Sequence, residues 1–210
     1  MRQRDRATRE RVLKAAAHLF ADRGFKKVTV RDICKAARAN VAAVNYHFGD
    51  KGGLYREVLQ LAIDTMRATS EAAREAGVGQ PADERLRRYI QVSLCRVVKG
   101  GSANWISRLI NREIADPTPA LDTLVEQGVR PRIDDLSAIA ADLLGCPVAD
   151  ERVPRCVASI HAQWMLFVPS PIASRFRSKF HLRSEDIDLV AEHIADFSLA
   201  GIRAVARRSG

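Results

Sequence analysis

The chain has 210 residues, of which 47% are hydrophobic, 28% charged and 6% aromatic. This composition is typical of a globular protein with one large or two small domains, and it excludes disordered, collagen-like and disulfide-rich chains. Lys and Arg outnumber Asp and Glu by 34 to 25, which gives a formal net charge of +9.

The positive charge is concentrated near the N-terminus. Residues 1–60 contain 14 Lys and Arg against 6 Asp and Glu, whereas residues 61–210 contain 20 against 19. Eight of the nine net positive charges therefore lie in the first 60 residues. A basic excess confined to one segment indicates a surface for a polyanion, which can be a nucleic acid, an anionic membrane or an acidic partner.

Neither a membrane span nor a secretion signal is predicted. No stretch approaches the roughly 18 consecutive apolar residues of a membrane-spanning helix, and the longest clear apolar run is residues 164–168. The Arg-rich N-terminus has no apolar segment behind it, unlike a secretory signal. The four cysteines lie far apart without CxxC spacing, so we expect a cytoplasmic protein with reduced thiols.

The basic segment is predicted to begin with a helix over residues 9–22. Val12, Ala16 and Phe20 recur at helical spacing and therefore share one face. Gly24 follows as a C-terminal cap.

Two short helices are predicted next. Thr29 is a suitable N-cap for the second helix, and Asp32 stands where the acid of a capping box belongs. Residues 38–40 break this helix, and residues 41–48 form the third. Three helices with a tight turn between the second and third, all inside the basic segment, predict a helix-turn-helix.

A long helix follows, with Asp50 as its N-cap and an end near Ala76. Beyond the Gly- and Pro-containing linker 77–81 the pattern stays helical, and no apolar–polar alternation is long enough for a strand, so the predicted fold is all-α. The predicted domains are a helix-turn-helix domain, residues 1–55, and a helical domain, residues 56–210. The later helices are predicted at residues 83–99, 102–116, 119–128, 131–145, 151–168 and 184–208.

The segment from residue 9 to residue 55 resembles the N-terminal domain of TetR/AcrR-type transcriptional regulators. This resemblance implies a DNA-binding domain joined through the long helix to an all-helical domain that dimerises and binds a ligand. A second set of residues, 40–49, 111–113 and 117–120, resembles the CecR (CerR) branch of the family. The residues that carry the first resemblance are Arg11-Val12-Leu13 with Ala16 and Phe20, Gly24-Phe25, residues 29–33, residues 45–48, Lys51 and Leu54-Tyr55.

The third helix suits the major groove, because small and polar side chains on its exposed side let its backbone approach the bases. Ala42 and Ala43 suit thymine methyl groups, and Asn45 can pair with an adenine edge. Lys51, at the start of the next helix, favours a phosphate. Pattern and resemblance together give the predicted DNA-binding set: Thr29, Arg31, Val41, Ala42, Ala43, Asn45, Tyr46, His47 and Lys51.

Some details of this segment stay open. The arginines of residues 2–6 are candidates for an additional arm on the DNA. Tyr46 as a core aromatic and His47 as a solvated residue are the simpler interpretations of these two side chains. Arg38 stands at the turn where the family usually has glycine, and positive φ there costs a non-glycine residue about 1 kcal/mol. Either the turn is adjusted, or Arg38 trades this strain for a phosphate contact.

The nearly neutral remainder of the chain is expected to dimerise, because proteins that read palindromic DNA present two recognition helices through two-fold symmetry. Helices 151–168 and 184–208 are the predicted interface, as a four-helix arrangement between two protomers. Their wide apolar stripes are equally compatible with an intramolecular core. The interface candidates are Val153, Val157, Ile160, Trp164 and Phe167 on the first helix and Ile187, Val190, Ile194 and Phe197 on the second.

The other helices are expected to enclose a pocket for a small hydrophobic or amphipathic effector, as the resemblance implies. Polar contacts are assigned to Arg108, Arg112 or Glu113, and the apolar candidates are equally compatible with ordinary core packing. No cofactor and no metal are predicted. The predicted ligand-binding set is Cys95, Trp105, Arg108, Leu109, Arg112, Glu113, His161, Trp164 and Met165.

These observations predict a ligand-responsive transcriptional repressor that binds a palindromic operator in double-stranded DNA as a homodimer and is released by its effector. We expect a population shift between two protomer arrangements, with the helix of residues 50–76 as lever.

Three other classes of function compete with this interpretation. An architectural DNA-binding protein without an effector would spread basic charge widely, whereas two thirds of this chain is nearly balanced. An enzyme is not expected, because the nearest pairs, Cys156 with His161 and His181 with Glu185, lack catalytic or metal-site spacing. No membrane partner is expected either, because the apolar face of the first helix is needed for the three-helix core.

Overall fold

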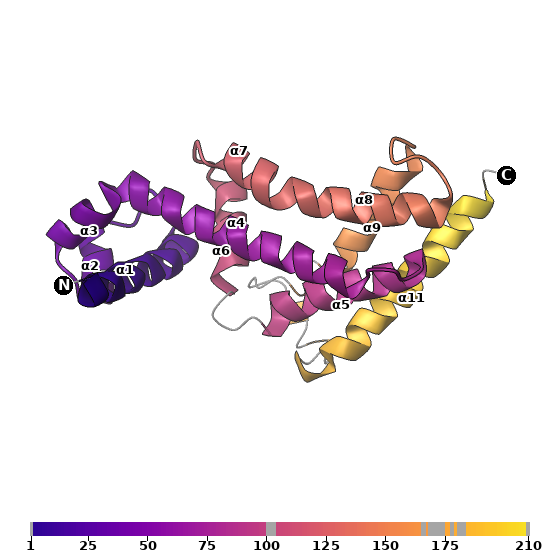
Figure 1. Cartoon of the computed structure of the whole chain (residues 1–210), viewed down its shortest axis with the longest axis horizontal. Helices are drawn as coiled ribbons and strands as arrows, with labels where there is room; N and C mark the ends of the chain where they lie inside the picture. The colour runs from indigo at the N-terminus through magenta and orange to yellow at the C-terminus, as the bar shows by residue number, and fades with distance from the viewer. Residues whose placement is uncertain are drawn as a thin grey trace. The chain divides into compact units, whose positions relative to one another are not determined.

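The protein is described by a computed structural model that covers residues 2–99, 104–164, 167, 175–176, 179 and 184–208. These residues are helical apart from turns and short connections, and they contain no strand, so the predicted all-α fold is confirmed. Figure 1 shows the elements in chain order. They are α1 (Arg2–Arg23), α2 (Val30–Ala37), α3 (Val41–Phe48), α4 (Lys51–Ala76), α5 (Ala82–Lys99), α6 (Asn104–Ala115), α7 (Leu121–Leu124), the π-helical turn η2 (Val125–Val129), α8 (Arg130–Leu144), α9 (Arg152–Trp164), the 3-10 turn η4 (Ser184–Asp186) and α11 (Ile187–Arg207).

The chain forms two compact units. Unit 1 contains residues 1–65 and 105–126, and unit 2 contains residues 66–104 and 127–210. The helix α4 contributes its first part to unit 1 and its last part to unit 2. The predicted helix-turn-helix domain, residues 1–55, lies inside unit 1, in which α6 and α7 pack with the N-terminal helices.

The core of unit 1 orients its first four helices. Phe20 of α1, Ile33 of α2, Val44 of α3 and Leu54 of α4 are completely buried. Burying such side chains stabilises a fold by about 1.5–3 kcal/mol each, which fixes the three-helix arrangement on the start of α4. The Tyr55 ring lies edge-on to Phe20, with ring centroids 4.9 Å apart.

Side-chain caps set where the short helices begin. The Thr29 hydroxyl accepts a hydrogen bond from the Asp32 amide at 3.1 Å, and the Asp32 carboxylate accepts one from the Thr29 amide at 3.0 Å. The predicted capping box is therefore confirmed. The Asn40 side chain accepts a hydrogen bond from the Ala43 amide at 2.8 Å and so caps α3, and Asp50 caps α4 through the Gly53 amide.

The turn between α2 and α3 keeps the left-handed conformation that suits glycine, although a non-glycine residue occupies it. Arg38 adopts left-handed φ and ψ of 49° each. Its amide donates to the Lys35 carbonyl, and the Ala39 amide donates to the Cys34 carbonyl, which is the hydrogen-bond pattern of a Schellman motif. Because glycine is the usual residue at this position, Arg38 holds the turn at a cost of about 1 kcal/mol.

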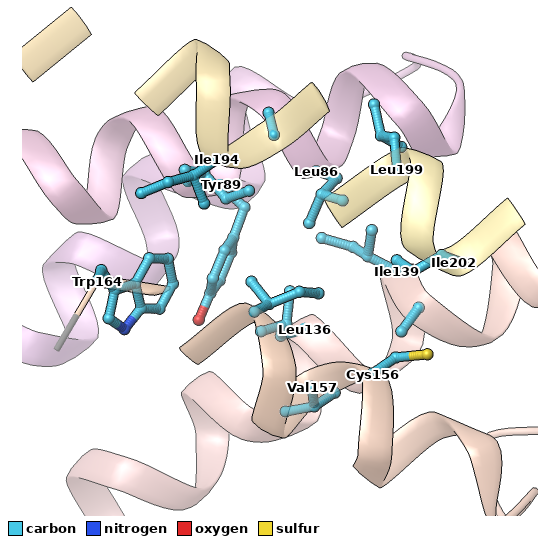
Figure 2. Packing of buried hydrophobic residues seen from close by; sticks show 14 of the residues in the cluster. Leu86, Tyr89, Leu136, Ile139, Cys156, Val157, Trp164, Ile194, Leu199 and Ile202 are labelled. Carbon is cyan, nitrogen blue, oxygen red and sulfur yellow. The ribbon is translucent and has the colours of Figure 1, made fainter. Parts of the chain in front are cut away.

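The core of unit 2 is a continuous apolar cluster from α5, α8, α9 and α11 (Figure 2). Leu86 of α5, Leu136 of α8 and Ile160 of α9 are nearly or completely buried in it. Tyr89 and Trp164 pack with ring centroids 6.2 Å apart, and the Tyr89 hydroxyl donates to the Arg132 carbonyl at 3.0 Å.

This cluster decides between the two interpretations of the apolar stripes on α9 and α11. Seven of the nine interface candidates are buried inside one protomer, so their assignment to a dimer interface is corrected to intramolecular core. The physical reason is that α5 and α8 already cover these faces. Val190 is partly buried, and Phe197 is 66% exposed. The seven are Val153, Val157, Ile160, Trp164, Phe167, Ile187 and Ile194.

All four cysteines are free thiols, and burial raises the pKa of Cys34 and Cys156. No described helix is long and apolar enough to cross a membrane.

Candidate nucleic-acid interface and helical body

The outer face of α3 is a surface of small and polar side chains. Val41 and Tyr46 are 44% and 74% exposed, and Ala42 and Asn45 are exposed beside them. Val44 and Phe48 on the opposite face are buried. We call Val41, Ala42, Asn45 and Tyr46 the reading surface. Its shape allows a helix backbone to approach base edges in a major groove, and its amide and methyl groups match adenine and thymine edges.

Three further members of the predicted DNA-binding set lie on the neighbouring elements or at the rim of this surface. Ala43 is half-buried, and its amide is already bonded to the Asn40 cap. Thr29 is exposed, although its hydroxyl is used by the capping box. Arg31 is exposed at the start of α2 and forms no hydrogen bond or ion pair with the described residues, so its guanidinium is available to an anion.

His47 does not share the orientation of the reading surface. Its side chain is only 9% exposed, and Nε2 lies 3.2 Å from a carboxylate oxygen of Asp5 in α1. The ring also packs edge-on to Tyr46 and Phe48. The solvated surface position that was the simpler interpretation of His47 is wrong, and the side chain holds the start of α1 against α3.

Lys51 has a structural role that the pattern did not indicate. Its ammonium donates to the carbonyl oxygens of Phe25 and Val28 at 3.0 and 3.1 Å, and it lies 4.3 Å from the centroid of the Phe25 ring. The side chain thus ties the loop between α1 and α2 to the first turn of α4. An ammonium group has three donors, so a phosphate contact by Lys51 stays a prediction.

The position of Lys35 and the capping contact of Arg11 escaped the sequence analysis, whereas Arg38 was already a candidate for a phosphate contact. Lys35 on α2 and Arg38 in the turn are exposed, and neither side chain forms a hydrogen bond or salt bridge with the described residues, although the Lys35 charge helps to lower the pKa of Asp32. Arg11 instead donates to the Ala37 carbonyl at 3.2 Å and so caps the end of α2. The signal that could have revealed Lys35 was its position one turn after Arg31 on the same short helix.

The polar residues predicted to anchor a ligand on α6 are engaged inside unit 1. Arg108 pairs with the Asp22 carboxylate at 2.8 Å, and Arg112 donates to the Asp22 carbonyl at 2.7 Å. Since Asp22 lies in the last turn of α1, the two arginines fasten α6 to the helix-turn-helix. Trp105 and Leu109 of α6 are buried as well.

Glu113 provides a buried link between α6 and α4. Glu113 is 1% exposed, and its carboxylate accepts hydrogen bonds from the Tyr55 hydroxyl and from the amide and hydroxyl of Thr118. Burial and the hydrogen bond to Glu113 raise the pKa of Tyr55, so the phenol stays protonated and keeps donating. A role of Arg108, Arg112 or Glu113 in ligand binding stays a prediction.

The remaining ligand-binding candidates belong to unit 2, except Met165, which lies outside the described residues. The Cys95 thiol donates a hydrogen bond to the Asp188 carboxylate at 3.3 Å. His161 packs edge-on to Trp164 with ring centroids 4.8 Å apart. Its Nε2 is buried without a hydrogen-bond partner among the residues that the structure describes, and burial together with Arg132 lowers the pKa of His161 to about 4. His161 is therefore neutral at pH 7.

A groove of about 540 Å³ runs along the outer side of α9 and α11. Cys156 and Gln163 from α9 line it together with Phe197, Gly201 and Val205 from α11. The Gln163 side chain donates to the Ser198 hydroxyl at 2.9 Å, so the two helices are joined beneath the groove. Phe197 is 66% exposed beside this groove, so its ring is available for contact with another surface.

Two family models match the chain. Residues 12–58 match the N-terminal domain of bacterial regulatory proteins of the TetR family, and residues 82–202, more than half of the chain, match the C-terminal domain of the HTH-type transcriptional dual regulator CecR. The chain belongs to the TetR family of transcriptional regulators, in its CecR group. The regulator therefore binds DNA, and the helix-turn-helix described above is its DNA-binding element.

Individual relatives agree with this assignment. The regulator is 28% identical over 154 residues to the dual regulator CecR of Shigella flexneri, covering 69% of this chain and 68% of CecR. It is 41% identical over 56 residues to the transcriptional repressor KstR2 of Mycolicibacterium smegmatis, covering 27% of each chain. The fold matches the fatty acid degradation regulator FadR of Bacillus halodurans with a TM-score of 0.66 at 13% identity, over 93% of this chain and 96% of FadR.

The Lys51 contacts predict a loss of stability in the regulator when the ammonium is removed. We expect Lys51→Met, which keeps the apolar stem, to lower the free energy of unfolding by about 1–3 kcal/mol, because two carbonyl oxygens lose their donor. Urea unfolding followed by circular dichroism measures this change. Lys27→Met, at an exposed position in the same loop, should change stability by less than about 0.5 kcal/mol. Equal effects of the two variants would contradict the structural role of Lys51.

The depressed pKa of His161 predicts a pH-dependent stability. The folded state favours the neutral imidazole, so its contribution is fully present above pH 6.5, the ordinary value, and is lost as the pH falls toward 4. An NMR titration should show His161 protonating near pH 4. His161→Gln should weaken the dependence of the unfolding midpoint on pH across this window, whereas His193→Gln at an exposed position should leave it intact. Protonation of His161 near 6.5 in the native protein would refute this prediction.

Proposed function

We propose that this TetR-family regulator binds a palindromic operator as a homodimer, represses transcription there, and is released by a small hydrophobic or amphipathic effector. The observation that carries the DNA-reading part is the exposed reading surface of α3, flanked by cations on α2 and its following turn that form no hydrogen bond or salt bridge with the described residues. We assign base contacts to this surface and phosphate contacts to Arg31 and Lys51. Since its partner is chromosomal DNA, a cytoplasmic location forms part of the proposal.

We assign the contact with a second, symmetry-related protomer to α9 and α11. Palindromic half-sites require two copies of α3 about one DNA turn apart, which a symmetric dimer provides. The groove between Cys156 and Phe197 supports this assignment, because it leaves an exposed Phe and the small Gly201 side by side with room for a helix from a second copy. The interface that we propose is therefore the outer side of these helices, with their buried stripes serving the core.

The proposal has two further parts, which are repression of transcription and release of the regulator from DNA by an effector. The name of KstR2 supports repression, while the name of CecR, a dual regulator, makes activation the second candidate. The shared helix α4 supports an effector mechanism, because a shift in unit 2 that moves α4 also moves the start of this helix in unit 1. An effector acts in this way only if it binds one of the two arrangements more tightly.

Selection of duplexes from a random pool tests the operator proposal. We expect a palindrome, and we expect Asn45→Ala to weaken binding to it by about 10-fold or more, because one adenine contact per half-site is lost. The affinity is measured by fluorescence anisotropy at fixed salt. Asn111→Ala, an exposed asparagine of α6, serves as the matched control and should bind normally. Enrichment of duplexes without any shared half-site would favour the architectural alternative.

A charge placed in the groove tests the dimer. We expect Phe197→Glu to raise the dimer dissociation constant by at least about 30-fold, because an exposed apolar anchor becomes a carboxylate that loses water on association. Analytical ultracentrifugation over a range of protein concentrations measures the constant. Val78→Glu, in the exposed turn before α5, should leave the dimer intact. A fully dimeric Phe197→Glu variant would place the interface elsewhere.

A further inference from the structure

Arg38 is unusual among the described residues because it is the one non-glycine residue with positive φ. The other described residues with positive φ are all glycines, at positions 24, 49, 79 and 145. Glycine would form the same turn without the steric conflict between Cβ and the backbone that Arg38 accepts. The geometry of the fold therefore does not account for an arginine at this position.

The side chain does not compensate for the strain through internal contacts. Arg38 is exposed, and its guanidinium forms no hydrogen bond or ion pair with any described residue. Arg11 of α1 differs from Arg38 in this respect, because its guanidinium donates a hydrogen bond to the Ala37 carbonyl and so stabilises the end of α2. Strain that persists without internal compensation points to a function of the strained residue.

The position of Arg38 suits a contact with the DNA backbone. It lies two residues before Asn40, the cap of α3, and three before Val41, the first residue of the reading surface. A guanidinium presents paired donors that match two phosphate oxygens, and phosphate contacts beside a recognition helix fix its register on the duplex. Lys35, exposed three residues earlier on α2, is a second positive charge close to Arg38 in the chain.

We propose that Arg38 binds a backbone phosphate at the edge of the α3 reading surface and thereby positions this helix in the major groove. The proposal extends the proposed function and rests on it. It assigns to the turn of the helix-turn-helix a contribution to affinity that does not depend on base sequence.

Three variants separate the charge of Arg38 from its backbone conformation. Arg38→Gly removes both the charge and the strain, Arg38→Asn removes the charge with a residue that tolerates the left-handed region, and Arg38→Lys keeps the charge. Each variant of the full chain is titrated by fluorescence anisotropy at several salt concentrations. The probes are the palindromic duplex selected by the wild-type chain and an unrelated duplex of equal length. Thermal unfolding is measured without DNA.

We expect Arg38→Gly and Arg38→Asn to bind both duplexes about 10-fold more weakly near 0.1 M salt, because a phosphate contact carries no base information. The slope of log affinity against log salt should fall in magnitude by about 1.8 for a dimer, which corresponds to two lost phosphate contacts. Arg38→Lys should keep the wild-type slope. Arg38→Gly should also raise the unfolding midpoint by about 2–4 °C, which rules out misfolding as the cause of weaker binding.

Two results would overturn the proposal, and they differ in what else they overturn. If Arg38→Gly and Arg38→Asn keep both the wild-type affinity and the wild-type salt slope, Arg38 does not contact DNA, while operator binding by the regulator stands. If the wild-type chain enriches no palindrome from the random pool, the proposed operator binding fails and the role of Arg38 fails with it.

Discussion

The burial of one face of α3 is the constraint on which the DNA-binding element depends. Val44 and Phe48 are buried in the core of unit 1, so the orientation of α3 about its own axis is fixed. Val41, Ala42, Asn45 and Tyr46 are then forced outward as a single surface. A helix of eight residues is too short to be stable alone, and its orientation therefore comes from this packing and from its Asn40 cap.

Polar contacts connect this element to a later part of the chain. Asp22 at the end of α1 receives two arginines from α6, and the buried Glu113 receives the Tyr55 hydroxyl from α4. A buried carboxylate needs such donors, because it would otherwise lose its hydration without compensation. The consequence is that α6 belongs structurally to the DNA-binding unit although it follows α5 of unit 2 in the chain. These contacts join α6 to α1 and to α4 within unit 1.

The sequence predicted local features well and side-chain partners poorly. The capping box of Thr29 and Asp32 and the extents of α3 and α4 followed from patterns over a few neighbouring residues, and the structure confirms them. The carbonyl contacts of Lys51 join residues 23 and 26 positions apart, and no local pattern encodes such a pair. The same holds for the stripes of α9 and α11, whose apolar spacing is identical whether α5 and α8 or a second protomer covers them. Ligand contacts, operator bases and dimer contacts remain predictions.

The sequence by itself determined the all-α fold, the helix-turn-helix and the concentration of positive charge in the first 60 residues, because helical periodicity, caps and charge are local properties of the chain. Only the tertiary structure decided which cations are free to meet DNA. Arg11 and Lys51 hold helices and loops together through hydrogen bonds, whereas Arg31, Lys35 and Arg38 form no hydrogen bond or salt bridge with the described residues. The physical reason is that a charge acts on whatever lies within a few ångströms of it, and folding alone decides which groups those are.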